Sequence, residues 1–169
     1  MIHEVLDLVD NQDSVIGQMH RKEIHSSNTN FHREVAIFLY NKNKEILLAQ
    51  RSLSKKVAPG WWDISAAGHI LSGENITQAA KRELFEELGV HVGLKFFNKH
   101  LDINDRESRF FYCYYAIVDL TSFEFDIAEV AQVQWVKIDD LENFAKNNLY
   151  STAYWSHKMI LTIAESIKL

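Results

Sequence analysis

The first 50 residues alternate short apolar runs with polar turns, a pattern typical of β-hairpins. The runs at 5–9 and 15–20 flank one polar turn, and the runs at 34–40 and 45–50 flank a second. Between them, residues 21–28 could form either a short helix or a loop. We therefore predict two antiparallel hairpins in this part of the chain.

The pattern changes to a helical period after residue 75. Apolar residues recur at four-residue spacing from Ala80 to Leu88, which predicts a helix over 76–88 with one buried stripe. Asn75 is suited to cap its start and Gly89 to end it. The remaining apolar segments predict three strands and then two helices, at 90–97, 109–118, 133–138, 139–147 and 152–167. This order favours an α/β fold in which helices cover a mixed sheet.

Composition narrows the class of protein. The 169 residues are 47% hydrophobic and 24% charged, which fits a single domain over residues 1–169 with a substantial core. The formal net charge of −5 disfavours binding to a nucleic-acid polymer. One cysteine excludes an internal disulfide and fits a reducing compartment. Since the longest apolar run, Phe110–Val118, is too short to span a membrane and no signal peptide is visible, we expect a cytoplasmic protein.

Three glutamates of the predicted helix carry the first sign of chemistry. Glu83, Glu86 and Glu87 fall within an arc of about 100° on one face, where their carboxylates repel one another. Glu86 and Glu87 also lie in the last turn, where the helix dipole disfavours negative charge. A divalent cation would reverse both costs, and oxygen ligands suit Mg²⁺ or Mn²⁺. The alternative is a solvated acidic face paired with Lys81 and Arg82.

The spacing around these glutamates decides between the two interpretations. Residues 68–90 match the Nudix box at each of its defined positions, namely Gly68, Glu74, Arg82, Glu83, Leu84, Glu86, Glu87, Gly89 and Val90. The chain therefore resembles the Nudix hydrolases. That resemblance implies an α/β/α sandwich with a mixed sheet. It also implies Mg²⁺-dependent cleavage of a diphosphate linked to another moiety, typically a nucleoside.

The resemblance also implies metal ligands. Glu86 and Glu87 would be the main ligands of Mg²⁺ or Mn²⁺, with the carbonyl of Gly68 as a further one. Glu83 would help to ligate the metal or act as base toward the attacking water. Nudix enzymes often add an acidic residue from a later strand or loop, and Glu129 is the best candidate here.

Further residues would support or weaken this assignment. By the same resemblance, Arg82 would orient the carboxylates through a charge-assisted hydrogen bond, and Glu74 would support Arg82 and its loop. Glu107 and Glu124 are weaker candidates for the later acidic ligand. Arg51 is a candidate phosphate contact, since a planar guanidinium suits that role, although a surface role is equally open.

Upstream segments are similar to isopentenyl-diphosphate isomerase, a branch that uses the Nudix fold for proton transfer. The similarity lies in 47–52 and 59–69. That enzyme binds an additional metal through three histidines and two glutamates, and it needs a cysteine just before the box glycine. Three histidines stand where its histidines are expected: His25, His32 and His69. Ala67 occupies the cysteine position, however, and 109–111 supply no glutamate where two are expected.

The box favours hydrolysis, because the isomerase departs from the complete box that this chain keeps. We expect a Mg²⁺-dependent hydrolase that cleaves a diphosphate linkage in a nucleoside diphosphate derivative or similar small metabolite. Substrate contacts are expected from Arg51, Trp62 and His69. An isomerase-like enzyme and a non-catalytic nucleotide-binding module are the open alternatives. The apolar side of the last helix, which includes Trp155, could also contribute to a homodimer face.

Overall fold

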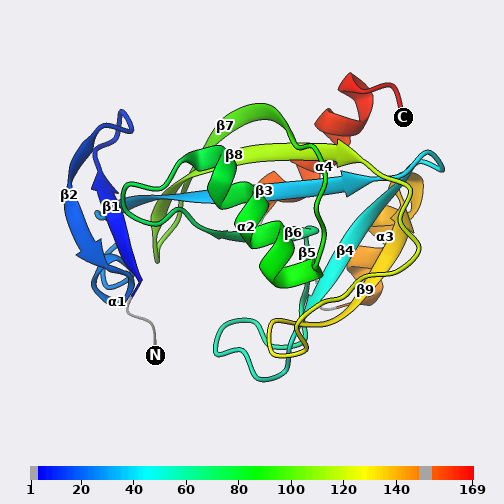
Figure 1. Ribbon diagram of the computed structural model, residues 1–169, viewed down its shortest axis with the longest axis horizontal. Coiled ribbons are helices and arrows are strands. Elements are labelled where there is room, and N and C mark those ends of the chain that lie inside the picture. The colour runs from blue at the N-terminus through cyan, green and yellow to red at the C-terminus, as the bar shows by residue number, and fades with distance from the viewer. Residues whose placement is uncertain (1–3, 149–153) are drawn as a thin grey trace.

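The computed structural model describes residues 4–148 and 154–169, which form one mixed sheet with helices on both faces (Figure 1). The strands are β1 (Val5–Val9), β2 (Val15–His20), β3 (Phe31–Tyr40), β4 (Glu45–Arg51), β5 (Trp62–Asp63), β6 (Ala66–His69), β7 (Lys95–Ile103), β8 (Ser108–Ile117) and β9 (Val130–Lys137). The helices are α1 (Arg21–Ile24), α2 (Ile76–Leu88), the 3-10 turn η1 (Ile138–Asp140), α3 (Leu141–Asn147) and α4 (Tyr154–Ser166).

Strand β3 lies at the centre of the sheet. It pairs antiparallel with β6, where Glu34 faces His69, and parallel with β8, where His32 faces Arg109. Strands β1 and β2 extend the sheet beyond one end of β3, and β4 meets its other end. Strands β5 and β9 flank β4, while β7 continues the sheet outward from β8. Three segments far apart in sequence, β6, β3 and β8, therefore run side by side.

Alternating residues of β3 build two cores on opposite faces of the sheet. Those that face α2 are Val35, Ile37 and Leu39, which share a cluster with Ala80, Leu84 and Leu88. Those on the other face are Ala36, Phe38 and Tyr40, which share a cluster with Leu141, Ile160 and Ile163 of α3 and α4. Because a strand points successive side chains to opposite faces, one buried strand can serve both layers. The predicted α/β/α sandwich with a mixed sheet is confirmed.

Two locally determined predictions agree with the structure residue by residue. The first hairpin spans the predicted 5–9 and 15–20, and α2 spans the predicted 76–88. The Asn75 side chain accepts hydrogen bonds from the first free N–H groups of α2. Gly89 ends the helix in the left-handed conformation, with φ of 66°. These features depend on residues within a few positions of one another.

Predictions that depended on apolar runs alone are partly wrong. The strand expected at 90–97 begins instead at Lys95. Val90 and Val92 lie before the strand, and their apolar side chains pack into the core that faces α2. The second hairpin exists only near its turn, since β3 then leaves β4 to pair with β6 and β8. The turn-rich segment after β4 also contains the short strands β5 and β6.

The last helix packs its described apolar residues onto the sheet. Met159, Ile160 and Ile163 are buried there, and the Tyr40 hydroxyl donates a hydrogen bond to the carbonyl of Ile160. The side chain of Trp155, which we expected on a homodimer face, lies outside the described residues. Among the residues that the structure does describe, no helix is both long and apolar enough to cross a membrane.

Candidate active site

The box glutamates face outward because the opposite side of α2 is fixed in the core. Leu84 and Leu88 are buried under the sheet, at 1% and 0% exposure, so the rotation of α2 about its axis is set. Glu83 and Glu87 are then half-buried at the edge of a cavity, while Glu86 is exposed. The three carboxylates converge on one face of α2, as the sequence predicts.

Arg82 ties these carboxylates to the loop before α2. Its guanidinium makes a two-pronged contact with Glu74, in which Nε and Nη2 each donate to one carboxylate oxygen at 2.8 Å. Nη1 donates to Glu83 at 2.6 Å and to Glu86 at 3.1 Å. Nη2 also donates to the backbone carbonyl of His69 at 2.9 Å. One planar group therefore orients three carboxylates and the backbone of β6 at once.

Gly68 brings the backbone of β6 against the glutamate face. A Cβ atom added to Gly68 would lie 2.5 Å or closer to all three atoms of the Glu83 carboxyl group. Only glycine leaves that space free. Gly68 and Glu83 consequently line the cavity side by side, together with Glu86 and Glu87.

The cationic side chains near the box glutamates are too few to balance the negative charges of their carboxylates. Burial raises the pKa of Glu83 to about 7, against the lowering effect of Arg82. Burial also raises the pKa of Glu87 well above its usual range, and the charges of Glu83, Asp63 and Glu129 raise it further. Groups in this state bind either protons or cations. Oxygen-only ligands are suited to Mg²⁺ or Mn²⁺, so the donor set fits the metal that the box implies.

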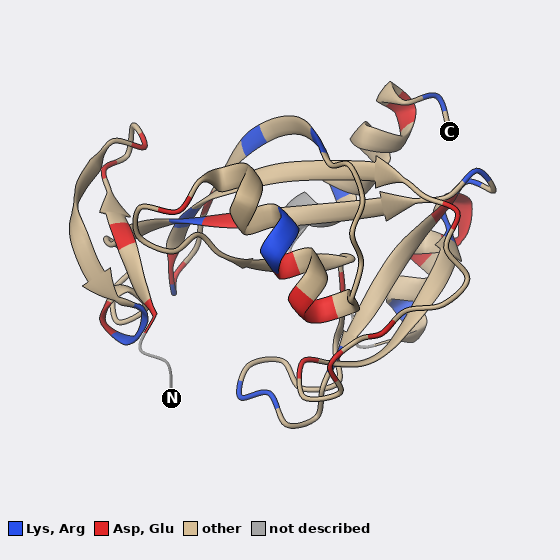
Figure 2. Ribbon diagram, in the orientation of Figure 1, with Lys and Arg blue, Asp and Glu red and all other residues tan. Residues whose placement is uncertain are grey.

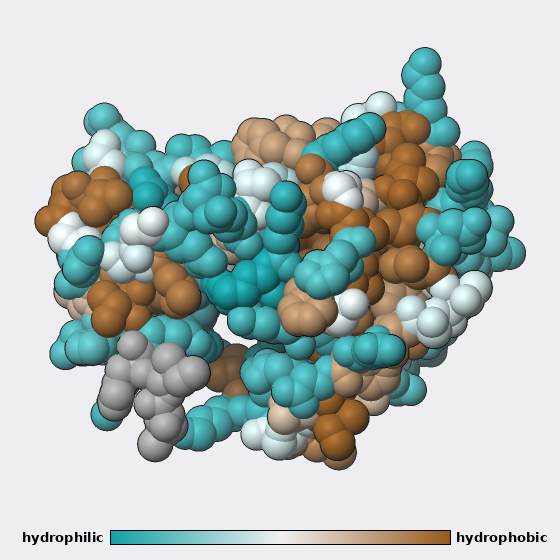
Figure 3. All heavy atoms as spheres, in the orientation of Figure 1, coloured by the Kyte–Doolittle hydropathy of each residue, from teal (hydrophilic) through white to brown (hydrophobic). Residues whose placement is uncertain are grey.

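The cavity beside α2 has a volume of about 710 Å³ and is bordered by two loops as well as the helix. Figure 2 shows the acidic part of α2 above these loops, and Figure 3 shows a hollow beneath hydrophilic side chains. The end of β4 contributes Arg51 to the lining, and the loop after β4 contributes Lys55. The loop before β9 contributes Asp126 and Glu129. Lys55 and Glu129 form an ion pair.

Of the three residues expected to contact substrate, two line the cavity and the third is buried in the core. Arg51 and His69 line the cavity. Trp62 lies instead in the core on the α3 and α4 side, where it is 5% exposed and packs edge-on against the ring of Phe144 at 5.3 Å. A buried ring in that position is part of the packing between sheet and helices.

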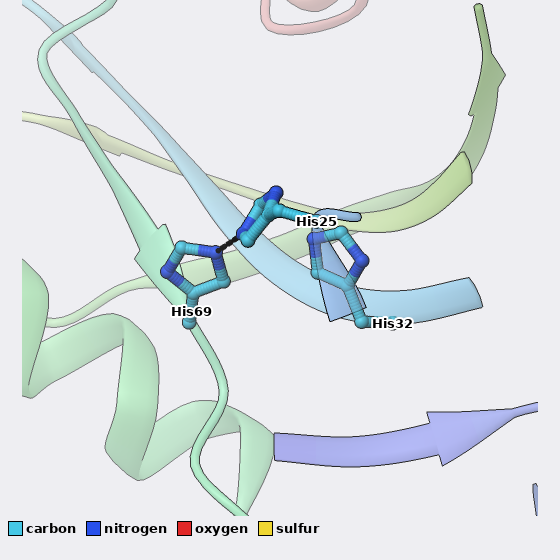
Figure 4. Close-up of side chains that lie close together, drawn as sticks. All are labelled: His25, His32 and His69. Atoms are coloured by element: carbon cyan, nitrogen blue, oxygen red, sulfur yellow. Dashed lines mark hydrogen bonds between the residues drawn. The ribbon is translucent and has the colours of Figure 1, made fainter. Parts of the chain in front are cut away.

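Three histidines from separate segments meet at the other end of the cavity (Figure 4). His25 follows α1, His32 lies on β3 and His69 ends β6. The Nε2 atoms of His25 and His69 are 2.9 Å apart, and one nitrogen from each of the three rings lies within 4.8 Å of the others. His69 also lines the cavity, so this histidine cluster adjoins the box.

Two carboxylates complete the histidine cluster, and the sequence interpretation missed their part in it. Nε2 of His32 lies 3.2 Å from Oε1 of Glu34, and Nδ1 of His25 lies 2.8 Å from Oε2 of Glu107. Arg109 stands where a glutamate was sought, and its Nη1 contacts Glu34 at 3.4 Å and Glu107 at 3.0 Å. The two-residue spacing of His32 and Glu34 on a strand was the signal, since it places both side chains on one face.

The electrostatics of the cluster favour metal-binding forms. Burial lowers the pKa of His69 to about 3, so its imidazole is neutral. Burial alone would raise the pKa of Glu34, but Arg109 and the hydrogen bond with His32 hold it below the usual range. Nδ1 of His32 is buried without a hydrogen-bond partner among the described residues. A neutral imidazole at His69 beside an ionised carboxylate at Glu34 suits a transition metal ion.

The raised pKa values predict that the metal-free protein loses stability as pH rises from about 4.5, the ordinary pKa of a glutamate, through about 7, the pKa of Glu83 in the folded protein. The folded state keeps protons on Glu83 and Glu87 that the unfolded chain has already released, so unfolding is favoured as pH rises through the folded pKa values. Thermal unfolding in EDTA should show this decrease. A Glu83→Gln, Glu87→Gln double variant should flatten it, and an equal slope in that variant would contradict the assignment.

Comparison with known proteins identifies the family of this chain. The NUDIX domain family model matches residues 30–155. An uncharacterized Nudix hydrolase from Clostridium acetobutylicum is 32% identical over 161 residues, which cover 88% of this chain and 77% of that protein. An isopentenyl-diphosphate Delta-isomerase from Salmonella arizonae is 38% identical over 92 residues, which cover 54% of this chain and only 50% of the isomerase.

Solved structures share the fold. A crystal structure of a Deinococcus radiodurans protein superposes with a TM-score of 0.79 at 25% identity, covering 94% of this chain and 98% of that one. The NUDIX domain of Shewanella oneidensis NrtR, solved with ADP ribose, gives a TM-score of 0.65 at 21% identity over 80% of this chain and 87% of that one. The matched family, the fold and the arrangement of the box agree, and this chain belongs to the Nudix hydrolase family.

Proposed function

We propose that this protein is a Mg²⁺- or Mn²⁺-dependent pyrophosphohydrolase that cleaves a diphosphate linkage in a nucleoside diphosphate derivative or similar small metabolite. The observation that carries the proposal is the contact of Arg82 with Glu74, Glu83 and Glu86 beside Gly68. It forms one edge of a cavity large enough for such a ligand.

Each box residue has a part in the proposed reaction. Glu86 and Glu87 would hold the metal ion together with the Gly68 carbonyl, and Glu129 would approach from the facing loop. When bound, the ion supplies charge neutralisation of the diphosphate and a more acidic water. Glu83 has a pKa of about 7, which suits a base that accepts the proton of the attacking water near neutral pH.

The proposal extends to how the substrate is attracted and to the domain extent and location of the protein. The net charge of −5 disfavours a nucleic-acid polymer and places the attraction for an anionic substrate on bound cations. Arg51 lines the cavity and would contact a phosphate. We further propose one domain over residues 1–169 and a cytoplasmic protein, with a homodimer as an open arrangement.

A hydrolysis screen tests the proposed function directly. The panel should contain nucleoside di- and triphosphates, nucleotide sugars, dinucleotide cofactors, ADP ribose and prenyl diphosphates, each with and without Mg²⁺. We expect release of phosphate or a nucleoside monophosphate from at least one class, and only with the ion. Tight binding without turnover across the panel would instead favour a non-catalytic binding module.

The histidine cluster favours an isomerase-like enzyme as the second candidate. It brings together three histidines and two carboxylates, the ligand types that the isomerase uses. Ala67 argues against this candidate, because an alanine side chain can neither donate nor accept a proton. Incubation with isopentenyl diphosphate separates the two functions, since double-bond migration would support the isomerase and diphosphate cleavage would support the hydrolase.

We also propose that the histidine cluster holds a second divalent ion of the transition series. The purified protein should then contain about one tightly bound transition metal per chain. His25→Asn should remove it, and Glu34→Gln should weaken binding about 10- to 100-fold. His91→Asn is a matched control, since His91 is exposed and stacks on Phe85 away from the cluster.

Elemental analysis after gel filtration measures the bound metal, and Co²⁺ absorption spectra report its ligands. The second site would be contradicted by two results together: wild-type protein that contains no transition metal, and a Co²⁺ spectrum that is the same for wild type and for the His25→Asn variant.

A further inference from the structure

The loop after β4 is attached to the loop before β9 by several contacts. The backbone N–H of Ser52 donates to the carbonyl of Glu129 at 3.0 Å. The Ser54 hydroxyl donates to the carbonyl of Ala128 at 3.2 Å, and the Lys55 ammonium pairs with the Glu129 carboxylate. The two loops lie side by side in Figure 1. Lys55 is therefore held by its backbone next to the segment that carries Glu129.

The other end of the same loop is also fixed. Nε of Arg51 donates to the carbonyl of Val57 at 3.1 Å, and the N–H of Gly60 donates to the carbonyl of Arg51 at 3.0 Å. These contacts close the loop back onto the end of β4. With both ends of the loop fixed, a change of partner by Lys55 needs only rotation of its four-carbon side chain, since the residue already lines the cavity.

Lys55 differs from the other cationic residues of the cavity. In the part of the chain that the structure describes, it is the single lysine in the lining, beside the arginines Arg21, Arg51, Arg82 and Arg109. A guanidinium makes several contacts in a fixed plane, whereas an ammonium on a flexible stem can exchange partners. The Lys55 side chain is 28% exposed and that of Glu129 is 41% exposed, so solvent can enter as the pair opens.

The partner of Lys55 is also a proposed metal ligand. Glu129 lies close enough to Glu87 for its charge to raise the pKa of that carboxyl group. A divalent ion held between Glu87 and Glu129 would repel an ammonium on the same carboxylate. The diphosphate of a substrate would bring new negative oxygens into the same cavity.

We propose that Lys55 is a substrate-binding residue that exchanges partners: it neutralises Glu129 in the metal-free protein and contacts the diphosphate oxygens once a metal ion binds Glu129. The inference rests on the proposed function and adds to it. In the metal-free site the lysine pairs with one carboxylate, that of Glu129, and it competes with the metal for it.

Metal binding without substrate tests the first half of the exchange. Calorimetric titration with Mn²⁺ should show two- to fivefold tighter binding to Lys55→Met than to wild type, because an exposed ion pair is worth about that factor. Lys56→Met is the matched control, since Lys56 is the exposed neighbour of Lys55 and does not line the cavity. In a Glu129→Gln background, the effect of Lys55→Met on Mn²⁺ binding should disappear.

Binding of methylenediphosphonate, a diphosphate that cannot be hydrolysed, tests the second half. At saturating Mn²⁺, Lys55→Met should bind this probe about tenfold more weakly than wild type. Lys55→Arg should recover most of the loss, and Lys56→Met should match wild type. A purely structural role for Lys55 would not produce opposite changes in metal and diphosphate affinity.

The outcomes separate this inference from the proposed function. If Mn²⁺ binding is sensitive to Glu87→Gln but Lys55→Met leaves it unchanged or weaker, the exchange is overturned and the proposed function stands. Unchanged methylenediphosphonate affinity in Lys55→Met also overturns the exchange. If wild type shows no Mn²⁺ binding that depends on Glu87, the exchange and the proposed function both fail.

Discussion

Replacing Glu87 by glutamine should lower Mg²⁺-dependent hydrolysis about 10²- to 10³-fold, equivalent to a loss of several kcal/mol of metal-ion stabilisation. The amide has the shape of the carboxylate but removes the charge that would hold the ion. In the metal-free protein the same change removes repulsion, because burial and the nearby charges of Glu83, Asp63 and Glu129 already raise the pKa of Glu87. Activity should therefore fall while metal-free stability stays equal or rises.

Two measurements check the Glu87→Gln prediction together. Steady-state kinetics on a substrate from the screen give the loss of turnover, and thermal unfolding with EDTA or Mg²⁺ gives stability. Wild type should gain stability from Mg²⁺, and the variant should not. Glu142→Gln is the control, since Glu142 is 77% exposed on α3. Full turnover in Glu87→Gln would show that the metal is bound elsewhere.

Gly68→Ala should have the second largest effect, a loss of about 100-fold in turnover with a change in stability within about 1 kcal/mol. The added methyl group would overlap the Glu83 carboxyl group. That carboxyl group is the end of a flexible side chain, so it can move aside at small cost to the fold. In moving, however, it leaves its contact with Arg82 and the position from which it would serve the metal or the water.

A double-variant cycle identifies the cause of the Gly68→Ala effect. In a Glu83→Ala background the clash is absent, so Gly68→Ala should cost little further activity. Gly93→Ala is the matched control, because a Cβ at Gly93 would meet no atom within 4 Å. Losses that simply add in the double variant would mean that Gly68 acts independently of Glu83.

The parts of the fold that sequence predicted well are those decided by near neighbours in the chain. The first hairpin and α2 have their predicted bounds, and Asn75 and Gly89 end α2 as expected. The box residues lie on one helix face because helical spacing alone fixes their relative directions. Their contacts with Gly68 depend on how β6 packs beside α2. Helical spacing does not predict that packing, and only the resemblance to the Nudix hydrolases indicated it.

Long-range pairing accounts for what sequence analysis missed. Trp62 was expected to contact substrate, but packing against α3 places it in the core. The carboxylates of the histidine cluster were sought at 109–111, whereas the structure supplies them from Glu34 and Glu107. No local pattern shows that β3 runs parallel to β8 and antiparallel to β6, because register depends on which faces are buried in the complete sheet.

The sequence by itself determined the glutamate face of α2, because that face depends on helical periodicity. The resemblance of residues 68–90 to the Nudix box, at fixed spacing, pointed to the family and to its sandwich of helices around a mixed sheet. Only the tertiary structure decided which distant side chains meet at either end of the cavity. Lys55 reaches Glu129 across 74 positions, and His25 reaches His69 across 44. Such contacts are set by strand order and loop packing, which minimise the free energy of the whole chain rather than of any one segment.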